Sequence, residues 1–261
     1  MKLSIVVTTF NRPDALLLVL KSIEFQSLLP NEVIIADDGS DQETATLIEQ
    51  YQHNTKIKVT HVWQRNKGFR AARSRNKAIA STDSEYIILI DGDMILHRDF
   101  IKDHFQLARP GFFIQGGRTL ISKESTEIAL QEHKIDFSIW SKGISNRKNA
   151  IHSKFLSNLF SRHSKKIKGI KSCNLSFYKE DCIKVNGFNN DFIGWGREDS
   201  EFVVRLINSN VQRNNVKFSC IQYHLWHEEN TRRNLAANEK YLEDAINENS
   251  SYCKNGISRF L

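Results

Sequence analysis

The fold is decided by residues 86–93, which read Tyr86-Ile87-Ile88-Leu89-Ile90-Asp91-Gly92-Asp93. The unbroken apolar run predicts a buried β-strand, and an acidic turn follows it directly. Leu3–Thr9 and Glu32–Asp37 follow the same plan, because each apolar run ends in polar or acidic residues. A further strand, the third along the chain, is expected at 57–63. These runs are continuous rather than alternating, which is typical of strands that are buried on both faces.

Between these strands, apolar residues recur with helical spacing. Helices are expected from Pro13 to Ile23, around Leu47–Tyr51 and over Ala71–Ala80. Alternating strands and helices predict an α/β fold with a mostly parallel central sheet flanked by helices. Ligands of such sheets bind beyond the carboxyl ends of the strands. The polar ends of the first, second and fourth strands along the chain therefore point to one site.

The second half of the chain is less regular. Strands are expected at 112–119, 169–178 and 217–223, and helices beginning at 197 and covering 234–247. The chain has no Ser/Gly-rich linker and no internal repeat, so a single domain over residues 1–261 is the simplest organisation.

Composition narrows the function classes without choosing one. The 261 residues are 40% hydrophobic and 26% charged, as in ordinary globular proteins. The four cysteines lack C-x-x-C spacing and are expected to be free thiols in a reducing compartment. No apolar run approaches the roughly 20 residues that cross a bilayer. The formal charge of +7 suits nucleic acid, an anionic membrane or a phosphorylated substrate.

Two motifs suggest a metal site. Asp91-Gly92-Asp93 offers two carboxylates at a strand end, which suit a hard divalent ion shared with a diphosphate, although D-x-D is also a common turn sequence. Tyr223-His224-Leu225-Trp226-His227 offers two imidazoles three residues apart after a strand. Core histidines are the alternative interpretation, and His227 is favoured slightly over His224 as a ligand.

A third motif suggests an acceptor site. Residues 194–199 read Gly194-Trp195-Gly196-Arg197-Glu198-Asp199. Acidic residues at a helix start also complement the helix dipole, which is a sufficient structural explanation for the carboxylates. The Gly-Trp-Gly run is not explained in that way. An aromatic ring between two glycines makes a platform for the apolar face of a sugar, beside a carboxylate able to accept a proton.

Taken together, the motifs resemble those of family-2 glycosyltransferases, over roughly residues 2–230. Val6 to Arg12, Asp37-Asp38-Gly39-Ser40 and Asp91-Gly92-Asp93 have the order and context of that family. Asn66-Lys67-Gly68, followed by Arg73 and Asn76, resembles its loop and helix beside the diphosphate. The 194–199 motif is similar to the acceptor motif of galactosyltransferases and bacterial chondroitin polymerase, except that Arg197 stands where a second glycine is frequent.

The resemblance implies a GT-A fold and an inverting, metal-dependent enzyme. The expected reaction transfers a hexose or N-acetylhexosamine from UDP-Gal, UDP-GalNAc or UDP-GlcNAc to a saccharide or lipid-linked acceptor, with Mn²⁺ or Mg²⁺, in bacterial cell-surface glycan synthesis. The enzyme is expected in the cytoplasm, either free or attached peripherally to the inner face of the cytoplasmic membrane. Residues 1–120 would form the nucleotide-sugar half, and residues 121–261 the acceptor half with a C-terminal helix.

Roles for individual residues are also implied by the resemblance. Asp199 takes the role of catalytic base, and Glu198 holds the acceptor. Asp93 is the direct metal ligand, with His227 and His224 as further ligands, and Asp91 lies on ribose or metal. The donor-binding set is Thr8, Asn11 and Arg12 in the uridine pocket, Asp37 on the uracil imide, Asp38 on the ribose side, Lys67, Gly68 and Arg73 near the diphosphate, and Trp195 on the sugar.

Two alternative functions require sequence features that this chain lacks, and a third requires a test of turnover. A sugar-phosphate nucleotidyltransferase should carry a Gly-rich basic loop after the first strand, which Thr8 to Pro13 does not provide. A nucleic-acid-binding protein should interleave basic and stacking aromatic residues, and no such pattern occurs. A non-catalytic UDP-sugar-binding protein is separable only by testing turnover.

The segment 122–168 matches no motif. Its apolar residues at 151–160 and its basic residues at 148–168 suggest an amphipathic helix. Such a helix can lie on an anionic membrane, or it can pack on the sheet with a solvated basic face. The sequence supports both interpretations equally.

Overall fold

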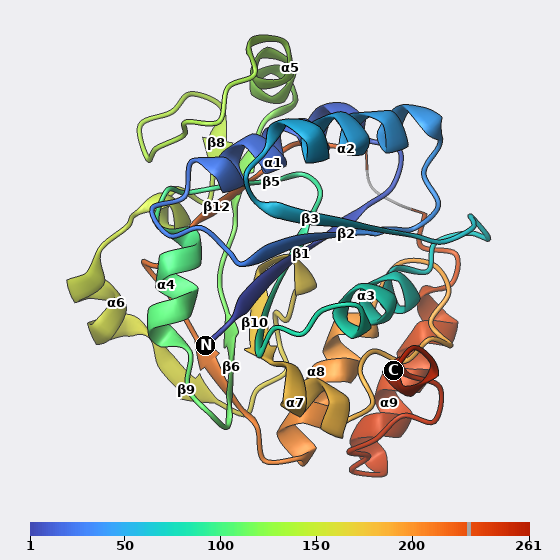
Figure 1. The fold of residues 1–261 in the computed structure, drawn as a ribbon. Coiled ribbons are helices and arrows are strands. Elements are labelled where there is room, and N and C mark those ends of the chain that lie inside the picture. The colour runs from blue at the N-terminus through green and yellow to red at the C-terminus, as the bar shows by residue number, and fades with distance from the viewer. Residues whose placement is uncertain (229–230) are drawn as a thin grey trace.

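The computed structural model describes residues 1–228 and 231–261 (Figure 1). Its main sheet begins with four parallel strands in the order β3-β2-β1-β4. They are β1 (Leu3–Thr9), β2 (Glu32–Asp37), β3 (Lys58–Trp63) and β4 (Tyr86–Asp91). The strands expected from the first half of the sequence are thus confirmed, and all start or end within one residue of the expected position. Every residue of β2 is buried, as its continuous apolar run predicts.

The second half of the chain completes this sheet. The order continues β4-β10-β6-β11-β9, with β10 antiparallel to both of its neighbours. The added strands are β6 (Phe112–Gln115), β9 (Arg162–Ser164), β10 (Leu175–Tyr178) and β11 (Gln212–Asn215). The strands expected at 112–119 and 169–178 are shorter than expected. Gly116 packs so closely on Asn174 that an added Cβ would lie 2.4 Å from the side-chain nitrogen of Asn174. β6 ends just before Gly116, and β10 begins just after Asn174.

A second, four-stranded sheet lies beside the first. Its order is β5-β12-β7-β8, from β5 (Met94–Leu96), β12 (Gln222–His224), β7 (Thr119–Ile121) and β8 (Ile144–Ser145). The strand expected at 217–223 is wrong in its start, because β12 begins only at Gln222. β12 runs antiparallel to β5 and pairs His224 with Met94. This pairing carries the histidine motif to the acidic turn after β4.

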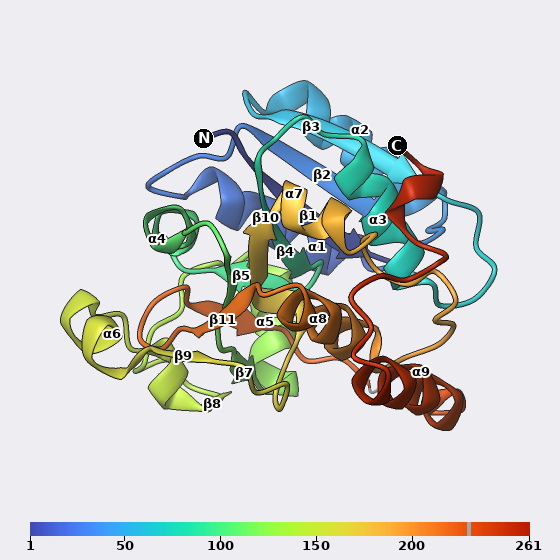
Figure 2. The same cartoon turned by 90° about the horizontal axis from the view of Figure 1, so that it is seen from below.

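Helices cover both faces of the main sheet (Figures 1 and 2). One face carries α1 (Pro13–Glu24), α2 (Gln42–Asn54) and α4 (Phe100–Leu107), and the other carries α3 (Ala71–Ala80), α7 (Lys179–Lys184) and α8 (Glu198–Asn208). The period-2 geometry of β1 divides its side chains between them, since Ile5 and Val7 join one core cluster and Val6 the other. Outside these layers lie α5 (Lys123–Glu132), which packs on the second sheet, and α9 (Leu235–Asn247), which packs on α8.

The amphipathic helix suggested for residues 148–168 is shorter than its apolar and basic residues imply. Within the described basic part only α6 (Lys154–Phe160) is α-helical, with seven residues, and Arg147–Ala150 form a short 3-10 helix. Ser161 is extended, and β9 follows at once as the last strand of the main sheet, paired with β11. The helix ends at Phe160 because the residues that follow are extended and pair with β11. No helix in the described ranges is long and apolar enough to cross a membrane.

The division at residues 120 and 121 is not a structural boundary. It falls within β7, and the second half contributes β9, β10 and β11 to the main sheet. The two functional halves expected from the sequence remain a prediction about binding.

Candidate active site

The carboxyl ends of β1, β2 and β4 meet at one edge of the main sheet. Register pairs Thr8 with Asp91 and Thr9 with Asp37. The amide of Gly92 donates to the carbonyl of Thr8 at 2.7 Å. A Cβ on Gly92 would lie 3.0 Å from that same oxygen, so the turn passes too close to β1 for a larger residue to fit without a shift. The three strand ends singled out in the sequence therefore surround one site.

Asp93 and the two histidines form a cluster at this edge. The Nε2 atoms of His224 and His227 each lie 3.5 Å from Oδ2 of Asp93, and the candidate ligand atoms are all within 4.8 Å of one another. Arg12, predicted in the uridine pocket, places Nη1 3.3 Å from the same oxygen. Burial alone would raise the pKa of Asp93, but the His224 hydrogen bond and the charges of His224, His227 and Arg12 outweigh it, so the pKa is lowered.

This donor set fits a divalent transition-metal ion. Oδ1 of Asp93 is buried and has no hydrogen-bond partner among the described residues, so a carboxylate oxygen is available. Imidazole nitrogen is a good ligand for transition metals, whereas Mg²⁺ prefers oxygen throughout. Between the two expected ions, two histidines beside one carboxylate favour Mn²⁺. The structure brings together all three residues expected to hold the metal, and their role as ligands stays a prediction.

Arg75 of α3 is a charged residue of the site that the sequence analysis missed. Its guanidinium donates to Oγ1 of Thr8 at 3.2 Å, to Oδ1 of Asp91 at 3.3 Å and to Oε1 of Glu198 at 3.1 Å. Its side chain is only 4% exposed. Helical periodicity could have found it, because Ala72, Arg75 and Ile79 form one buried stripe of α3.

Glu198 and Asp199 are the first two residues of α8, and Arg75 contacts both Glu198 and Asp91. Asp199 is partly exposed, and Glu198 is buried. Oδ1 of Asp199 accepts from the Ser200 amide at 2.6 Å, and Oδ2 accepts from the Ser172 amide at 3.3 Å. Burial, with repulsion from Glu198, raises the pKa of Asp199 to about 6 despite the opposing charge of Arg75. A carboxylate with this pKa is a better proton acceptor near neutral pH than an ordinary aspartate.

Trp195 precedes this pair in a loop of positive φ. Gly194 has φ +80° and Gly196 has φ +108°, conformations that side-chain-bearing residues rarely adopt. The indole is 41% exposed, and the guanidinium of Arg232 lies 5.5 Å from its ring centroid. The glycines thus turn the backbone so that a large ring stands at the surface next to the acidic pair.

The two aspartates after β2 hold the loops around the site. Asp37 is fully buried and accepts from the amides of Gly39 and Ser40 and from Nε2 of His61, at 3.0, 2.8 and 2.9 Å. Burial would raise its pKa, but these hydrogen bonds lower it. Asp38 accepts from the Arg70 amide at 2.6 Å, and its pKa is raised by burial. In the structure both carboxylates brace loops, and their contacts with uracil and ribose remain predictions.

Of the residues expected near the diphosphate, Lys67 and Gly68 are more exposed than the carboxylates of the candidate site. Arg73 donates to Oε1 of Gln64 at 2.6 Å and stacks over Phe260, at one wall of a cavity of about 410 Å³. Within the described residues Arg73 forms no ion pair with Asp91, Glu198 or Asp199. Asn11 accepts from the Asp41 amide at 2.8 Å and joins the loops after β1 and β2.

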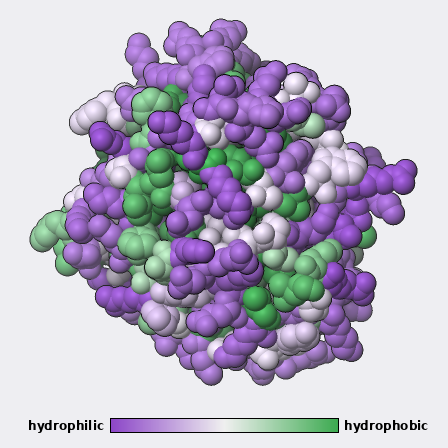
Figure 3. Space-filling view, in the orientation of Figure 1, coloured by the Kyte–Doolittle hydropathy of each residue, from purple (hydrophilic) through white to green (hydrophobic). Residues whose placement is uncertain are grey.

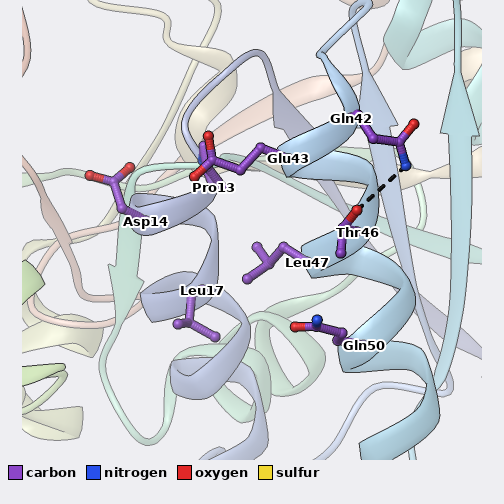
Figure 4. Close-up of a pocket in the computed structure, with 8 residues that line it drawn as sticks. All are labelled: Pro13, Asp14, Leu17, Gln42, Glu43, Thr46, Leu47 and Gln50. Carbon is purple, nitrogen blue, oxygen red and sulfur yellow. Dashed lines mark hydrogen bonds between the residues drawn. The ribbon is translucent and has the colours of Figure 1, made fainter.

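A separate groove lies between α1 and α2 (Figure 4). It has a volume of about 450 Å³, with Leu17 and Leu47 on its facing walls. None of the site residues expected from the sequence lines it. The candidate active site is therefore identified by its side chains, not by the size of a cavity.

A family model described as glycosyl transferase family 2 matches residues 4–167, which is more than half of the chain. The chain belongs to glycosyl transferase family 2. A second model, described as the N-terminal domain of galactosyltransferase, matches residues 153–228. That range contains the Trp195 loop, Asp199 and both histidines, so the resemblance seen in the motifs is confirmed.

Similar proteins include bacterial polysaccharide synthases. The chain is 29% identical over 221 residues to the hyaluronan synthase of Pasteurella multocida, covering 78% of this chain and 22% of that protein. It is 28% identical to the chondroitin synthase of P. multocida strain Pm70, covering 78% and 23%. The chain thus spans about a fifth of the length of these two relatives. A β-1,3-glucosyltransferase of Campylobacter jejuni is 27% identical over 189 residues, which is 71% of this chain and 59% of that enzyme.

Solved structures confirm the GT-A fold. S. aureus TarS superposes with a TM-score of 0.61 at 17% identity, covering 94% of this chain and 40% of that one. The mannosyltransferase PcManGT from Pyrobaculum calidifontis, in complex with GDP-Man and Mn²⁺, has a TM-score of 0.58 at 14% identity, with 87% and 58% covered. Identities this low support the fold alone.

Proposed function

We propose that the chain is an inverting, metal-dependent glycosyltransferase that moves a hexose or N-acetylhexosamine from a UDP-sugar to a saccharide or lipid-linked acceptor in bacterial cell-surface glycan synthesis. One observation carries the proposal. Arg75 joins the acidic turn of Asp91 to the Glu198-Asp199 pair, so a candidate metal cluster and a candidate base share one edge of the sheet. The two sides of a displacement reaction, leaving group and nucleophile, would then meet between them.

On the donor side, Asp93, His224 and His227 would hold the ion. A bound Mn²⁺ or Mg²⁺ supplies positive charge that stabilises the diphosphate as it leaves. Arg12 contacts Asp93 at 3.3 Å in this structure, and its guanidinium is long enough to turn to a phosphate instead. These side chains bind and orient the donor.

On the acceptor side, Asp199 would remove the proton of the attacking hydroxyl. A sugar hydroxyl is a poor nucleophile at neutral pH, so a positioned carboxylate must accept its proton as the new bond forms. The amides of Ser172 and Ser200 fix the orientation of this carboxylate. Glu198 would grip the acceptor while Arg75 compensates its charge, and Trp195 offers an apolar face to a sugar ring.

The choice of a uridine donor does not follow from the fold. TarS has been solved in complex with UDP, whereas PcManGT was solved with GDP-Man, so the fold accommodates both nucleotides. The motif-based preference for UDP-Gal, UDP-GalNAc or UDP-GlcNAc is therefore part of the proposal. A base and ribose would enter beyond the end of β2, and Asp37 and Asp38, at that end, would bind them.

The test is a donor panel with Mn²⁺ present. UDP release from UDP-Gal, UDP-GalNAc, UDP-GlcNAc and UDP-Glc is compared with GDP release from GDP-Man, with and without oligosaccharide acceptors. We expect one UDP-sugar to dominate, acceptor to accelerate release, and NMR to show an inverted anomeric configuration in the product. Binding of UDP-sugars without turnover would favour a non-catalytic binding protein, and pyrophosphate-dependent cleavage would favour a nucleotidyltransferase.

A further inference from the structure

The net positive charge of the chain comes from one segment. Residues 137–179 contain ten Lys and Arg residues and no Asp or Glu, while the rest of the chain has 27 Lys and Arg against 30 Asp and Glu. The whole surplus of +7 therefore comes from these 43 residues. Segregation of this kind creates a local positive field, which a uniform distribution of the same charge would not.

The helix in this segment has the reverse of the usual burial pattern. In α6 the buried residue is Ser157, whereas Phe155, Leu159 and Phe160 are 75%, 51% and 45% exposed. A helix of a globular protein normally turns its apolar stripe to the core. In Figure 3 apolar side chains protrude at the left edge of the molecule, where Figure 1 places α6. The described residues thus leave Phe155 and Leu159 at least half uncovered, while Phe160 packs partly against Phe218.

Basic side chains surround that face. α6 begins at Lys154 and is followed within one turn by Arg162, and β9 leads into Lys165, Lys166 and Lys168. All five are exposed, and none forms an ion pair with a carboxylate in the described part of the chain. The α6–β9 unit sits at the outer end of the main sheet (Figure 2), where the order of strands ends.

We propose that α6 and β9 dock this domain on a bilayer that contains anionic lipid. The three apolar side chains would enter the headgroup region, and the lysines would pair with acidic headgroups around them. Stable attachment to a membrane usually needs two such signals together, an apolar one and a polybasic one. Anionic leaflets attract basic segments close to the surface, and the attraction decays within a Debye length of about 8 Å at physiological salt.

Charge argues against a second copy of the chain as the occupant. A two-fold dimer would place the same patch against itself and bring the two sets of lysines together without intervening carboxylates. Like charges facing each other across an interface suppress association. A lipid surface provides both of the complementary properties, an apolar interior and negative charge at its rim.

The patch is also close to the acceptor side of the candidate site. Ser172, whose amide donates to Asp199 at 3.3 Å, is four positions after Lys168, and four extended steps of the chain span at most about 14 Å. If the proposed function is correct, a lipid-linked acceptor lying in the same membrane would be presented near the base. This consequence rests on the proposed function, but the docking of α6 does not.

Vesicle flotation tests the apolar part of the patch. Wild-type protein should float with phosphatidylcholine vesicles containing phosphatidylglycerol, remain unbound with phosphatidylcholine alone, and dissociate in high salt. Phe155→Ser/Leu159→Ser should lose most of the bound fraction. Phe25→Ser is the matched control, since Phe25 is 70% exposed but lies outside the segment, and it should float like the wild type.

A matched pair of triple variants tests the charge. Lys165→Glu/Lys166→Glu/Lys168→Glu should lower partitioning by at least about two orders of magnitude, because each lysine near an anionic surface contributes roughly fivefold. Lys184→Glu/Lys240→Glu/Lys254→Glu changes the net charge equally at exposed lysines elsewhere and should have a far smaller effect.

Equal binding to neutral vesicles, or binding to neither kind, would overturn the proposal. So would a dimer that light scattering shows to be lost in Phe155→Ser/Leu159→Ser, or a preference for RNA over anionic vesicles. The proposed function is tested apart from docking. Asp199→Asn should still float, and Phe155→Ser/Leu159→Ser should still transfer sugar to a water-soluble acceptor. Loss of turnover with intact flotation, or the reverse, assigns the failure to one proposal.

Discussion

Arg75 of α3 donates a hydrogen bond to Glu198 at the start of α8, with 3.1 Å between Nη1 and Oε1. The two residues are 123 positions apart, because α3 follows β3 and α8 begins at the end of the 194–199 motif. The same guanidinium contacts Asp91 at 3.3 Å. A single buried cation therefore couples the acidic turn after β4 to the acidic start of α8.

Replacing Arg75 should destabilise the protein strongly. Breaking a buried ion pair on one side leaves uncompensated charge, which costs about 3–5 kcal/mol. We expect Arg75→Ala to lower the free energy of urea unfolding by this amount and to abolish transfer. Arg73→Ala is the control on the same helix, since Arg73 is partly exposed and stacks on Phe260, and it should cost less than about 1 kcal/mol. Equal losses for the two variants would contradict the role of Arg75 as a buried link.

Removal of metal should abolish transfer. EDTA should stop UDP release and Mn²⁺ should restore it, more effectively than Mg²⁺ because two of the three candidate donors are imidazoles. Asp93→Ala should weaken Mn²⁺ binding and UDP binding together in calorimetry. His133→Ala changes an exposed histidine outside the cluster and should leave both unchanged. Full activity in EDTA would rule out this site.

Asp199→Asn should remove catalysis while preserving binding. The change keeps the size of the side chain and removes the proton acceptor, so kcat should fall by about 10²–10⁴-fold. UDP affinity, measured by calorimetry, should stay near that of the wild type. Glu198→Gln should mainly raise the acceptor KM. Loss of UDP binding in Asp199→Asn, or retention of most of its kcat, would place the base elsewhere.

The raised pKa of Asp199 predicts the pH dependence of the wild type. The base must be ionised, so kcat/KM should fall about tenfold per pH unit below about pH 6, where the carboxyl becomes protonated. Stability should change in the opposite sense. A folded pKa of about 6 exceeds the unfolded value of about 3.9, so the folded state holds the proton more tightly, and the contribution of this group to stability falls as pH rises between these values. In Asp199→Asn, urea unfolding should lack that component.

Gly39 should control the loop beside the nucleotide. A Cβ at this position would lie 2.4 Å from the backbone nitrogen of Asn66, and φ is +101°. Gly39→Ala should push the 64–70 loop outward, weakening UDP binding and lowering the melting temperature. Gly111→Ala is the control, because Gly111 also has positive φ, nothing lies within 4 Å of its added Cβ, and it is outside the predicted donor-binding set. If the two variants lose UDP affinity equally, backbone strain rather than contact with Asn66 is responsible.

The sequence by itself determined the first half of the sheet. The apolar runs of β1, β2 and β4 have few alternatives to burial on both faces, and the helices between them make a parallel arrangement the simplest one. The polar residues after these strands then share an edge because parallel strands end on the same side. The family, the fold and the candidate carboxylates could therefore be inferred from local patterns.

Tertiary structure decided what those patterns do not specify. β11 reads Gln212-Arg213-Asn214-Asn215, a polar sequence that becomes a strand only because β6 and β9 pair with it. His224 reaches Asp93 through the register of β12 on β5, and Arg75 meets Glu198 only when α3 and α8 cover the same face. These contacts join residues far apart in the chain, so their energies depend on neighbours that no local sequence pattern records. The exposure of Phe155 on α6 has the same origin, since an apolar residue shows its lack of a partner only when the rest of the chain has folded around it.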